Sequence, residues 1–335
     1  MTDVAVISFS CDAALRSLFD ASGSAEGSCG WFEALAETTL ALGERAVLAV
    51  AREAGTAIAA LPLVQTAEGM RALTAPYATR YAPALANLEG ARLLGARARE
   101  YAGGVLRLDA VDEGDPGMAA YIEGLAASGL TAARYDHFVN WFELVTDFDS
   151  YWRGRPSRLR TTVRRKLLQA SNAGAEFQCF RNEFDDAVAI YRDIYGSSWK
   201  AEEPHPDFIP ALVRKLAPEV RLGVMTLAGE AVAAQIWLVR GRKATIFKLA
   251  HRESAAEHSP GTLLTHWMAQ TLIREDALTE IDFGRGDDTY KRDWLGHKRM
   301  RIGLIAADRR TRAGLSALLR EVIPTRLSAR RKRRS

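Results

Sequence analysis

Two pairs of apolar segments follow the same pattern, and in each pair a short turn containing glycine joins the segments. The first pair is 46–52 and 56–64, and the second is 221–227 and 231–239. Two apolar runs that meet at such a turn are typical of a β-hairpin. The sequence therefore predicts one hairpin in each half of the chain.

The two hairpins are also related in sequence. At an offset of 174 residues, segments 54–64 and 228–238 are identical at five of eleven positions. Because this offset is about half of the 335-residue chain, a duplicated domain would explain it. Four of the five shared residues are alanine, so coincidence in an alanine-rich chain is the alternative. The shared turn and hydrophobic pattern favour duplication.

Length and composition indicate a globular protein of two domains. Hydrophobic residues make up 48% of the chain and charged residues 26%, close to the globular average. We place the domains at 1–150 and 151–310, followed by a helical end and basic tail at 311–335. The chain has no apolar run long enough for a membrane span and does not open on a signal-like segment, so we expect a cytoplasmic protein. The cysteines are too widely spaced for a disulfide framework or a Cys-x-x-Cys metal site: Cys11, Cys29 and Cys179.

Positive charge is concentrated in two short stretches. Arg326–Ser335 holds six basic residues and no acid, and without these six the formal net charge falls from +4 to −2. Arg153–Lys166 holds seven more basic residues, again without an acid. The tail is either a solvated end or an anchor for acidic lipid or nucleic acid, and we favour the solvated end.

Further elements surround the second hairpin. Periodic apolar residues predict four helices and two strands, namely helices at 157–171, 184–195, 208–216 and 261–275 and strands at 243–250 and 279–284. Shorter helices are expected in the first half at 13–21 and 31–42. Helices before an antiparallel meander, and a helix that crosses to a further strand, are typical of an α/β fold with a mixed sheet.

The segment Asp282–Trp294 lies where the last of these strands ends, a place where α/β sheets bind ligands. Gly284 and Gly286 permit close approach of the backbone. Charged or hydroxyl-bearing side chains accompany them: Arg285, Asp287, Asp288, Tyr290 and Lys291. The alternative is a polar turn in which Asp288 caps the next helix. A cap would explain one aspartate but not the cations, so we favour a functional segment.

This order of strands and helices resembles the GNAT acyltransferase superfamily. Four segments are similar to its branch associated with cellulose and exopolysaccharide biosynthesis, namely Arg158–Arg165, Ser198–Trp199, Ser259–Gly261 and Asp282–Lys291. That branch is related to the Fem-type aminoacyltransferases, which the run from Tyr290 to Gly296 also resembles. The resemblance implies an α/β fold with tandem, Fem-like GNAT domains. Each domain would be a mixed, mostly antiparallel twisted sheet flanked by helices, and the first would be degenerate.

The resemblance implies an acyl donor, acetyl-CoA or another acyl-CoA, held by backbone N–H groups at the start of a helix. The matching residues are Ser259, Gly261 and Thr262, and we expect Lys291 to contact the donor as well. A helix N-terminus is a physically reasonable site for a pyrophosphate. The glycine-rich loop of the superfamily is altered here, because Pro260 is added and one glycine remains. Aminoacyl-tRNA, the donor of Fem-type proteins, is therefore the alternative.

The resemblance also implies a proton donor for the departing thiolate, and Tyr290 lies in the matching region. A phenol is protonated at neutral pH and able to donate, whereas a packed core tyrosine is the alternative. For the base that activates the acceptor we expect Asp287 first and His251 second. His251, His258 and His266 fall on different predicted elements, so we expect no metal site.

Acceptor recognition is expected from residues suited to a phosphate or a sugar. Arg160 and Arg164 form an i, i+4 stripe on a predicted helix, with a solvated cationic face as the alternative. Trp199 is suited to stacking on a sugar ring, although the end of a helix also suits a core tryptophan. The remaining expected substrate contacts are Arg285, Tyr77 and Tyr81.

These expectations combine into an N-acyltransferase that moves an acyl group from a CoA-type donor to an amine or hydroxyl. The acceptor would be a small molecule or a saccharide in polysaccharide or cell-envelope biosynthesis, with polysaccharide-synthesis machinery as the partner. Two alternatives stay open. One is a Fem-like transferase that uses aminoacyl-tRNA, and the other is a catalytically inactive GNAT-fold subunit of a polysaccharide-synthesis complex. The sequence does not identify the acceptor, because one fold serves many substrates.

Overall fold

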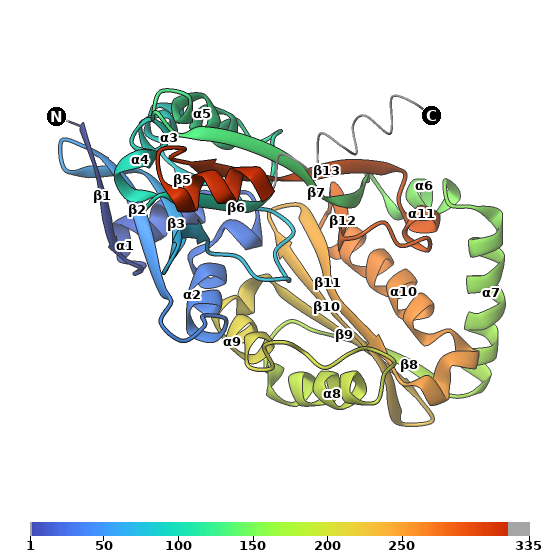
Figure 1. Ribbon diagram of the computed structural model, residues 1–335. Coiled ribbons are helices and arrows are strands. Elements are labelled where there is room, and N and C mark those ends of the chain that lie inside the picture. Colours follow the sequence, from blue (N-terminus) through green and yellow to red (C-terminus); the bar gives the residue numbers. More distant parts are fainter. Residues whose placement is uncertain (1, 321–335) are drawn as a thin grey trace. The chain divides into compact units, whose positions relative to one another are not determined.

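The computed structural model describes residues 2–320 (Figure 1). The basic tail expected at the end of the chain lies outside these residues. The chain forms two compact units, of which one comprises the chain up to Phe138 with the segment from Met300, and the other Val139–Arg299. The domains expected at 1–150 and 151–310 stay a prediction about pieces that fold independently. No helix among residues 2–320 is long and apolar enough to cross a membrane.

The first unit is a mixed sheet with helices. In chain order its elements are β1 (Thr2–Ser8), α1 (Ala13–Asp20), α2 (Cys29–Thr38), β2 (Arg45–Glu53), β3 (Thr56–Thr66), β4 (Gly69–Ala72), β5 (Ala84–Leu85), α3 (Leu88–Ala96), α4 (Ala98–Tyr101), β6 (Val105–Val111), α5 (Pro116–Leu125), the first part of β7 (Thr131–Leu144) and most of β13 (His297–Ala307). The strand order is β1-β2-β3-β4-β6-β13, and β5 pairs with β3. These pairs are antiparallel except β4 with β6, which is parallel.

The second unit has the same plan. After the end of β7 come α6 (Phe148–Arg153), α7 (Ser157–Asn172), β8 (Ala175–Phe180), α8 (Phe184–Gly196), α9 (Phe208–Lys215), β9 (Val220–Leu227), β10 (Glu230–Arg240), β11 (Lys243–His251), α10 (Pro260–Glu275), β12 (Glu280–Arg285) and α11 (Lys291–Trp294). The strand order is β7-β12-β11-β10-β9-β8, and only β11 with β12 is parallel. In Figure 1, α8 and α9 lie on one face of strands β8–β11, and α10 lies on the other.

The two predicted hairpins are present and share their irregularities. The Ala-Gly turns have φ of 49° and 85° at 54–55, and of 48° and 85° at 228–229. Two successive positive φ angles are what a two-residue type I′ turn requires. In both hairpins the register then shifts, because Ile58 and Val232 are extra residues in their strands. An alanine-rich composition does not by itself produce a bulge. Bulges at positions 174 residues apart therefore favour duplication over coincidence.

Each half of the chain contributes its last strand to the unit built mainly from the other half. Residues 140–144 of β7 pair with β12, and residues 302–307 of β13 pair with β6. Both pairs contain a bulge, where Ala110 of β6 and Gly284 of β12 have φ of 57° and 65°. These two residues are again 174 positions apart. The predicted tandem α/β fold with mixed, mostly antiparallel sheets is thus confirmed.

Two details of the first unit differ from expectation. The helix expected at 31–42 covers Cys29–Thr38 instead. Cys11 and Cys29, whose spacing argued against a disulfide framework, form one disulfide with their Cα atoms 6.1 Å apart. A framework needs several regularly placed cysteines, whereas a single bond needs only two that packing brings together. Here the segment before α1 meets the start of α2.

Candidate active site

The parallel strands β11 and β12 mark the candidate site. Only Lys243–Thr245 of β11 pair with β12, through Glu280–Asp282, so within the described chain the two strands do not pair beyond these residues. β11 is also irregular at Phe247, where its register with β10 shifts. Ligands of α/β sheets bind near such strand ends, and backbone groups without a neighbouring strand need other partners. The region beyond the paired residues is therefore suited to a ligand.

A buried polar cluster fixes the end of β12. Asp282 accepts hydrogen bonds from the N–H group of Gly284 and from the side-chain amide of Asn140, each at 2.6 Å. Arg299 joins this cluster by donating to Asp282, to Glu280 and to the amide oxygen of Asn140. Buried charges are tolerated when they are paired and hydrogen-bonded in this way. The cluster holds the bulge at Gly284 and so positions the segment that follows β12.

α10 begins beside the end of β11, and the first turn of α10 contains N–H groups that the helix itself does not bond. Ser259 precedes the helix with φ of 55°, and the N–H groups of Gly261 and Thr262 have no acceptor within the helix itself. Gln235, which is fully buried on β10, donates to the Gly261 carbonyl oxygen at 3.2 Å and to the Thr265 hydroxyl at 2.6 Å. This contact anchors the N-terminus of α10 over the sheet. A helix N-terminus positioned like this favours an anion.

His251, Trp199 and Gly261 meet at the end of β11. The His251 and Trp199 rings are 4.4 Å apart between centroids. A Cβ atom at position 261 would lie 3.2 Å from Cδ2 of His251, so the imidazole borders the first turn of α10. Trp199 lies beyond the end of α8 and is 52% exposed, which excludes a core role for it. The structure thus brings together three residues that were predicted for three different tasks.

Tyr290 precedes α11 and is 50% exposed. Partial burial and the charge of Asp288 raise its pKa to about 12. The phenol therefore stays protonated at neutral pH and is able to donate. This state agrees with the proton-donor role expected from the sequence, and the role itself stays a prediction.

Asp287 is held as an anion. Its carboxylate lies 2.9 Å from Nζ of Lys298 and accepts a hydrogen bond of 2.9 Å from Nε1 of Trp141. The hydrogen bond from Lys298 and the one from Trp141 lower the pKa of Asp287. A carboxylate stabilised in this way is a weaker base. The contacts suit a positioning role, and the base role expected for Asp287 stays a prediction.

Lys291 is buried, and its ammonium group binds within its own segment. Nζ donates to the carbonyl oxygen of Arg285, lies 3.4 Å from that of Gly286 and forms a 3.2 Å ion pair with Asp288. Burial lowers its pKa. These bonds close the turn after β12, so they explain Lys291 without a donor contact. Arg285 is half-buried at the end of β12.

Four of the residues expected to bind the acceptor are distant in sequence from the segment 282–294. Arg160 and Arg164 are exposed on α7, and Arg160 donates to the carbonyl oxygen of Arg155 at 3.1 Å. Tyr77 and Tyr81 belong to the first unit and are only 8% and 1% exposed. The Tyr81 hydroxyl donates to the Pro62 carbonyl oxygen. Their burial suits a packing role in the first unit rather than the expected substrate contact.

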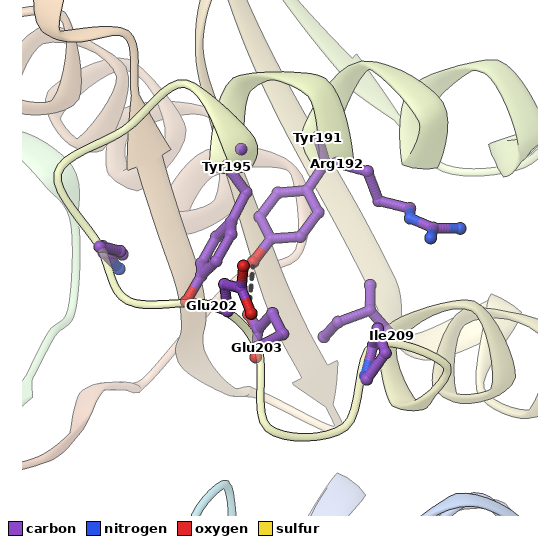
Figure 2. Close-up of a pocket in the computed structure, with 9 residues that line it drawn as sticks. Tyr191, Arg192, Tyr195, Glu202, Glu203 and Ile209 are labelled. Atoms are coloured by element: carbon purple, nitrogen blue, oxygen red, sulfur yellow. Dashed lines mark hydrogen bonds between the residues drawn. The ribbon is translucent and has the colours of Figure 1, made fainter.

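A cavity of about 320 Å³ in the second unit was not anticipated from the sequence (Figure 2). Tyr191 and Tyr195 project from α8 toward Glu202 and Glu203, while Arg192 points away from them. The other lining residues are Gly196, Lys200, Pro206 and Ile209. The only sequence signal was the i, i+4 spacing of the two tyrosines, which core residues share.

A salt bridge closes one side of this cavity. Nζ of Lys248, on β11, lies 2.7 and 2.9 Å from the two carboxylate oxygens of Glu203. The Tyr191 hydroxyl donates to the same carboxylate at 3.3 Å. Because these residues are separated by up to 57 positions in the chain, the sequence did not indicate that they meet.

The site lies in a segment that matches a family model. Residues 157–292 match the model of an acetyltransferase (GNAT) domain. This range includes His251, the N-terminus of α10 and Tyr290. No curated protein matches the chain in sequence.

Solved structures extend the likeness to the whole chain. FemX is 12% identical with a TM-score of 0.63, and the match covers 90% of this chain and 96% of FemX. A tandem GNAT protein from the clavulanic acid biosynthesis pathway is 16% identical with a TM-score of 0.50, covering 91% and 99%. L-PGS from Bacillus licheniformis is 13% identical with a TM-score of 0.55, covering 86% and 94%. At these identities the likeness concerns the fold alone. Residues 157–292 of the second unit thus match a GNAT acetyltransferase domain, and the fold of the chain is similar to those of FemX and of a tandem GNAT protein.

Proposed function

We propose that the protein transfers an acyl group from an acyl-CoA to an amine or hydroxyl of a small-molecule or saccharide acceptor. The observation that carries this proposal is the N-terminus of α10 beside Leu249 and His251, in the part of β11 beyond its pairing with β12 and inside the segment that matches the GNAT domain. When bound, the thioester supplies an activated carbonyl group and a sulfur leaving group. The chain has to bind, orient and exchange protons.

The first turn of α10 fits the pyrophosphate of such a donor. Glycine at position 261 lets the first turn of α10 lie close against β11, because a side chain here would begin only 3.2 Å from the ring of His251. Pro260 stands at the first helical position, where its missing N–H costs nothing. The added proline is thus compatible with an anion site at the following residues.

Two side chains suit the proton transfers. Tyr290, protonated at neutral pH, is able to give its proton to a sulfur leaving group. His251 is better suited than Asp287 to accept a proton from the acceptor, because Asp287 is engaged by Lys298 and Trp141. Lys291 and the cluster around Asp282 would act indirectly by holding the Tyr290 segment in place.

The cellular setting rests on the sequence motifs. We infer a cytoplasmic enzyme of polysaccharide or cell-envelope biosynthesis, working with the synthesis machinery, because four segments resemble that branch of the superfamily. A second candidate is transfer from aminoacyl-tRNA. It is favoured by the exposed arginines of α7 and by the FemX-like fold.

Calorimetry with acetyl-CoA tests the proposal. We expect saturable binding to the full chain and at least about tenfold weaker binding by Gly261→Leu, which would fill the space beside the first turn of α10. Gly23→Leu is the control, since nothing lies within 4 Å of a Cβ atom at that position. If acetyl-CoA does not bind, and if tRNA binds with a steep salt dependence that Arg160→Glu and Arg164→Glu abolish, the aminoacyl-tRNA alternative replaces this proposal.

A further inference from the structure

Lys200 differs from two other buried or partly buried lysines of the second unit. Lys248 is paired with Glu203, and Lys291 is bonded to carbonyl oxygens and Asp288. Within residues 2–320, Lys200 forms no such ion pair. Its Nζ instead lies 5.7 Å from the centre of the Trp199 ring and 5.9 Å from that of Tyr195. The cavity therefore contains an amine that packing holds and that is not paired with a carboxylate.

The surroundings of this amine favour its neutral form. Burial and the positive charge of Lys248 lower the pKa of Lys200 to about 8, and the charges of Glu203 and Asp288 oppose this only in part. Other titratable or charged groups lie around it on α8, on its own segment, on β11 and after β12, namely Arg192, Tyr191, Tyr195, Glu202, His251 and Lys291. With a pKa of about 8, roughly a tenth of this amine is neutral at pH 7, a far larger share than for an ordinary lysine, and the neutral form is the nucleophile.

A chain of neighbouring residues also connects Lys200 to the donor region. It follows Trp199, whose ring lies on His251, and His251 borders Gly261 in the first turn of α10. Its pKa also responds to the charges of Asp288 and Lys291, so the segment that bears Tyr290 lies within electrostatic reach. Lys200, which lines the cavity, is thus two neighbours away from the turn proposed for the donor's pyrophosphate.

We propose that Lys200 is a self-acylation site, whose side-chain amine takes the acyl group from an acyl-CoA that is held by its pyrophosphate at the N-terminus of α10. This inference rests on the proposed function, because it needs the same donor. The neutral Nζ attacks the thioester carbonyl carbon, a C–N bond forms and the C–S bond breaks. The proton lost by nitrogen ends on the sulfur, so the products are an Nε-acyl-lysine and a free thiol.

Acylation would change the cavity that it occurs in. An amide has no titratable proton and no positive charge, so acylated Lys200 would no longer repel the ammonium groups of Lys248 and Lys291. The added acyl group would also occupy part of the cavity volume of about 320 Å³. The modification would therefore exclude a ligand that needs this space or a cation at this place.

Peptide mass spectrometry tests the inference on the full chain. After incubation with isotopically labelled acetyl-CoA, we expect at least about tenfold higher acetyl occupancy on Lys200 than on Lys248 or on the exposed Lys243, since the neutral fraction of an amine rises about tenfold for each unit by which its pKa falls. Lys200→Arg should lose that label. In a parallel reaction without acetyl-CoA, sulfo-NHS acetate should label Lys200 first, with a midpoint near pH 8.

The outcomes separate this inference from the proposed function. Binding of acetyl-CoA by calorimetry, with Lys200 labelled no more than Lys243, would overturn self-acylation and leave the acyltransferase proposal standing. Preferential labelling by sulfo-NHS acetate but not by acetyl-CoA would likewise overturn it, because the amine would be reactive but out of reach of the donor. Absence of acetyl-CoA binding would remove both. Gly261→Leu should lose the acetyl-CoA label and keep the sulfo-NHS acetate label.

Discussion

At the residue scale, His266 shows how packing sets a charge state. Its imidazole lies on α10 against two aromatic rings, with centroids 4.5 Å from Trp152 and 5.4 Å from Phe148. Burial lowers the pKa of His266 to about 4. An unfolded histidine titrates near its ordinary pKa of about 6.5. Between these two values the unfolded chain binds a proton that the folded chain does not.

This difference predicts a pH-dependent loss of stability. The contribution of neutral His266 is fully present above about pH 6.5 and is lost as pH falls toward 4, where it levels off. We expect the free energy of unfolding to fall by about 2 kcal/mol across this window. This value already allows for solvent screening at a partly exposed ring. His266→Phe keeps the aromatic packing and should remove this part of the slope in urea unfolding measured at pH 7.5 and 4.5. An unchanged slope in that variant, or an equal change in the control His258→Phe, would contradict this account.

The three lysines of the second unit show why part of the site was not predictable at this scale. In the sequence Lys200, Lys248 and Lys291 look alike, and only Lys291 falls in a motif. Their different roles follow from burial and from partners up to 45 positions away. The residues around Ser259, Gly261 and Tyr290 were proposed from a resemblance of short motifs, which can be recognised along the sequence, and their roles stay a prediction. The cavity was not, since it depends on contacts between α8, the segment after it and β11.

At the element scale, the two Ala-Gly turns have nearly the same φ angles, and each places an alanine at positive φ. An alanine with positive φ carries steric strain that glycine and asparagine avoid more readily. The duplicated hairpins thus keep a residue that their turn type does not favour at 54 and 228. Helices and hairpins were predicted from sequence because their periodicity and turns are local. The bulges at Ile58 and Val232 were not, because they depend on the pairing of two strands.

Asparagine in place of the turn alanine should stabilise the protein. Ala228→Asn creates the Asn-Gly pair that type I′ turns prefer, and we expect a gain of about 0.5 to 1 kcal/mol in the free energy of unfolding. Ala54→Asn should give a similar gain. Ala231→Asn, at a strand position three residues later, should destabilise instead, because asparagine is disfavoured in strands. Urea unfolding of the three variants measures these effects, and equal changes in all of them would refute the turn explanation.

At the scale of the whole molecule, the tandem repeat is closed by an exchange of final strands. β7 follows the first half in sequence but supplies residues 140–144 to β12 of the second unit. β13 follows the second half but supplies residues 302–307 to β6 of the first unit. A sequence boundary near 150 separates both strands from their partners. Local patterns do not reveal such an exchange, because strand pairing depends on residues that are far apart in the chain.

The exchange predicts which piece of the chain is able to fold alone. Residues 139–299 retain β7 beside β12, and Trp141 and Val145 of this segment pack in one hydrophobic cluster with Ile281 and Phe283. Residues 151–310, the domain expected from the sequence, lack that strand and leave β12 as an unpaired apolar edge, which favours aggregation. We therefore expect fragment 139–299 to unfold cooperatively in urea by circular dichroism, and fragment 151–310 to show a broad transition or to aggregate. Equal cooperativity of the two fragments would mean that β7 adds no stability to the second unit, and that the boundary near 150 describes an independent domain.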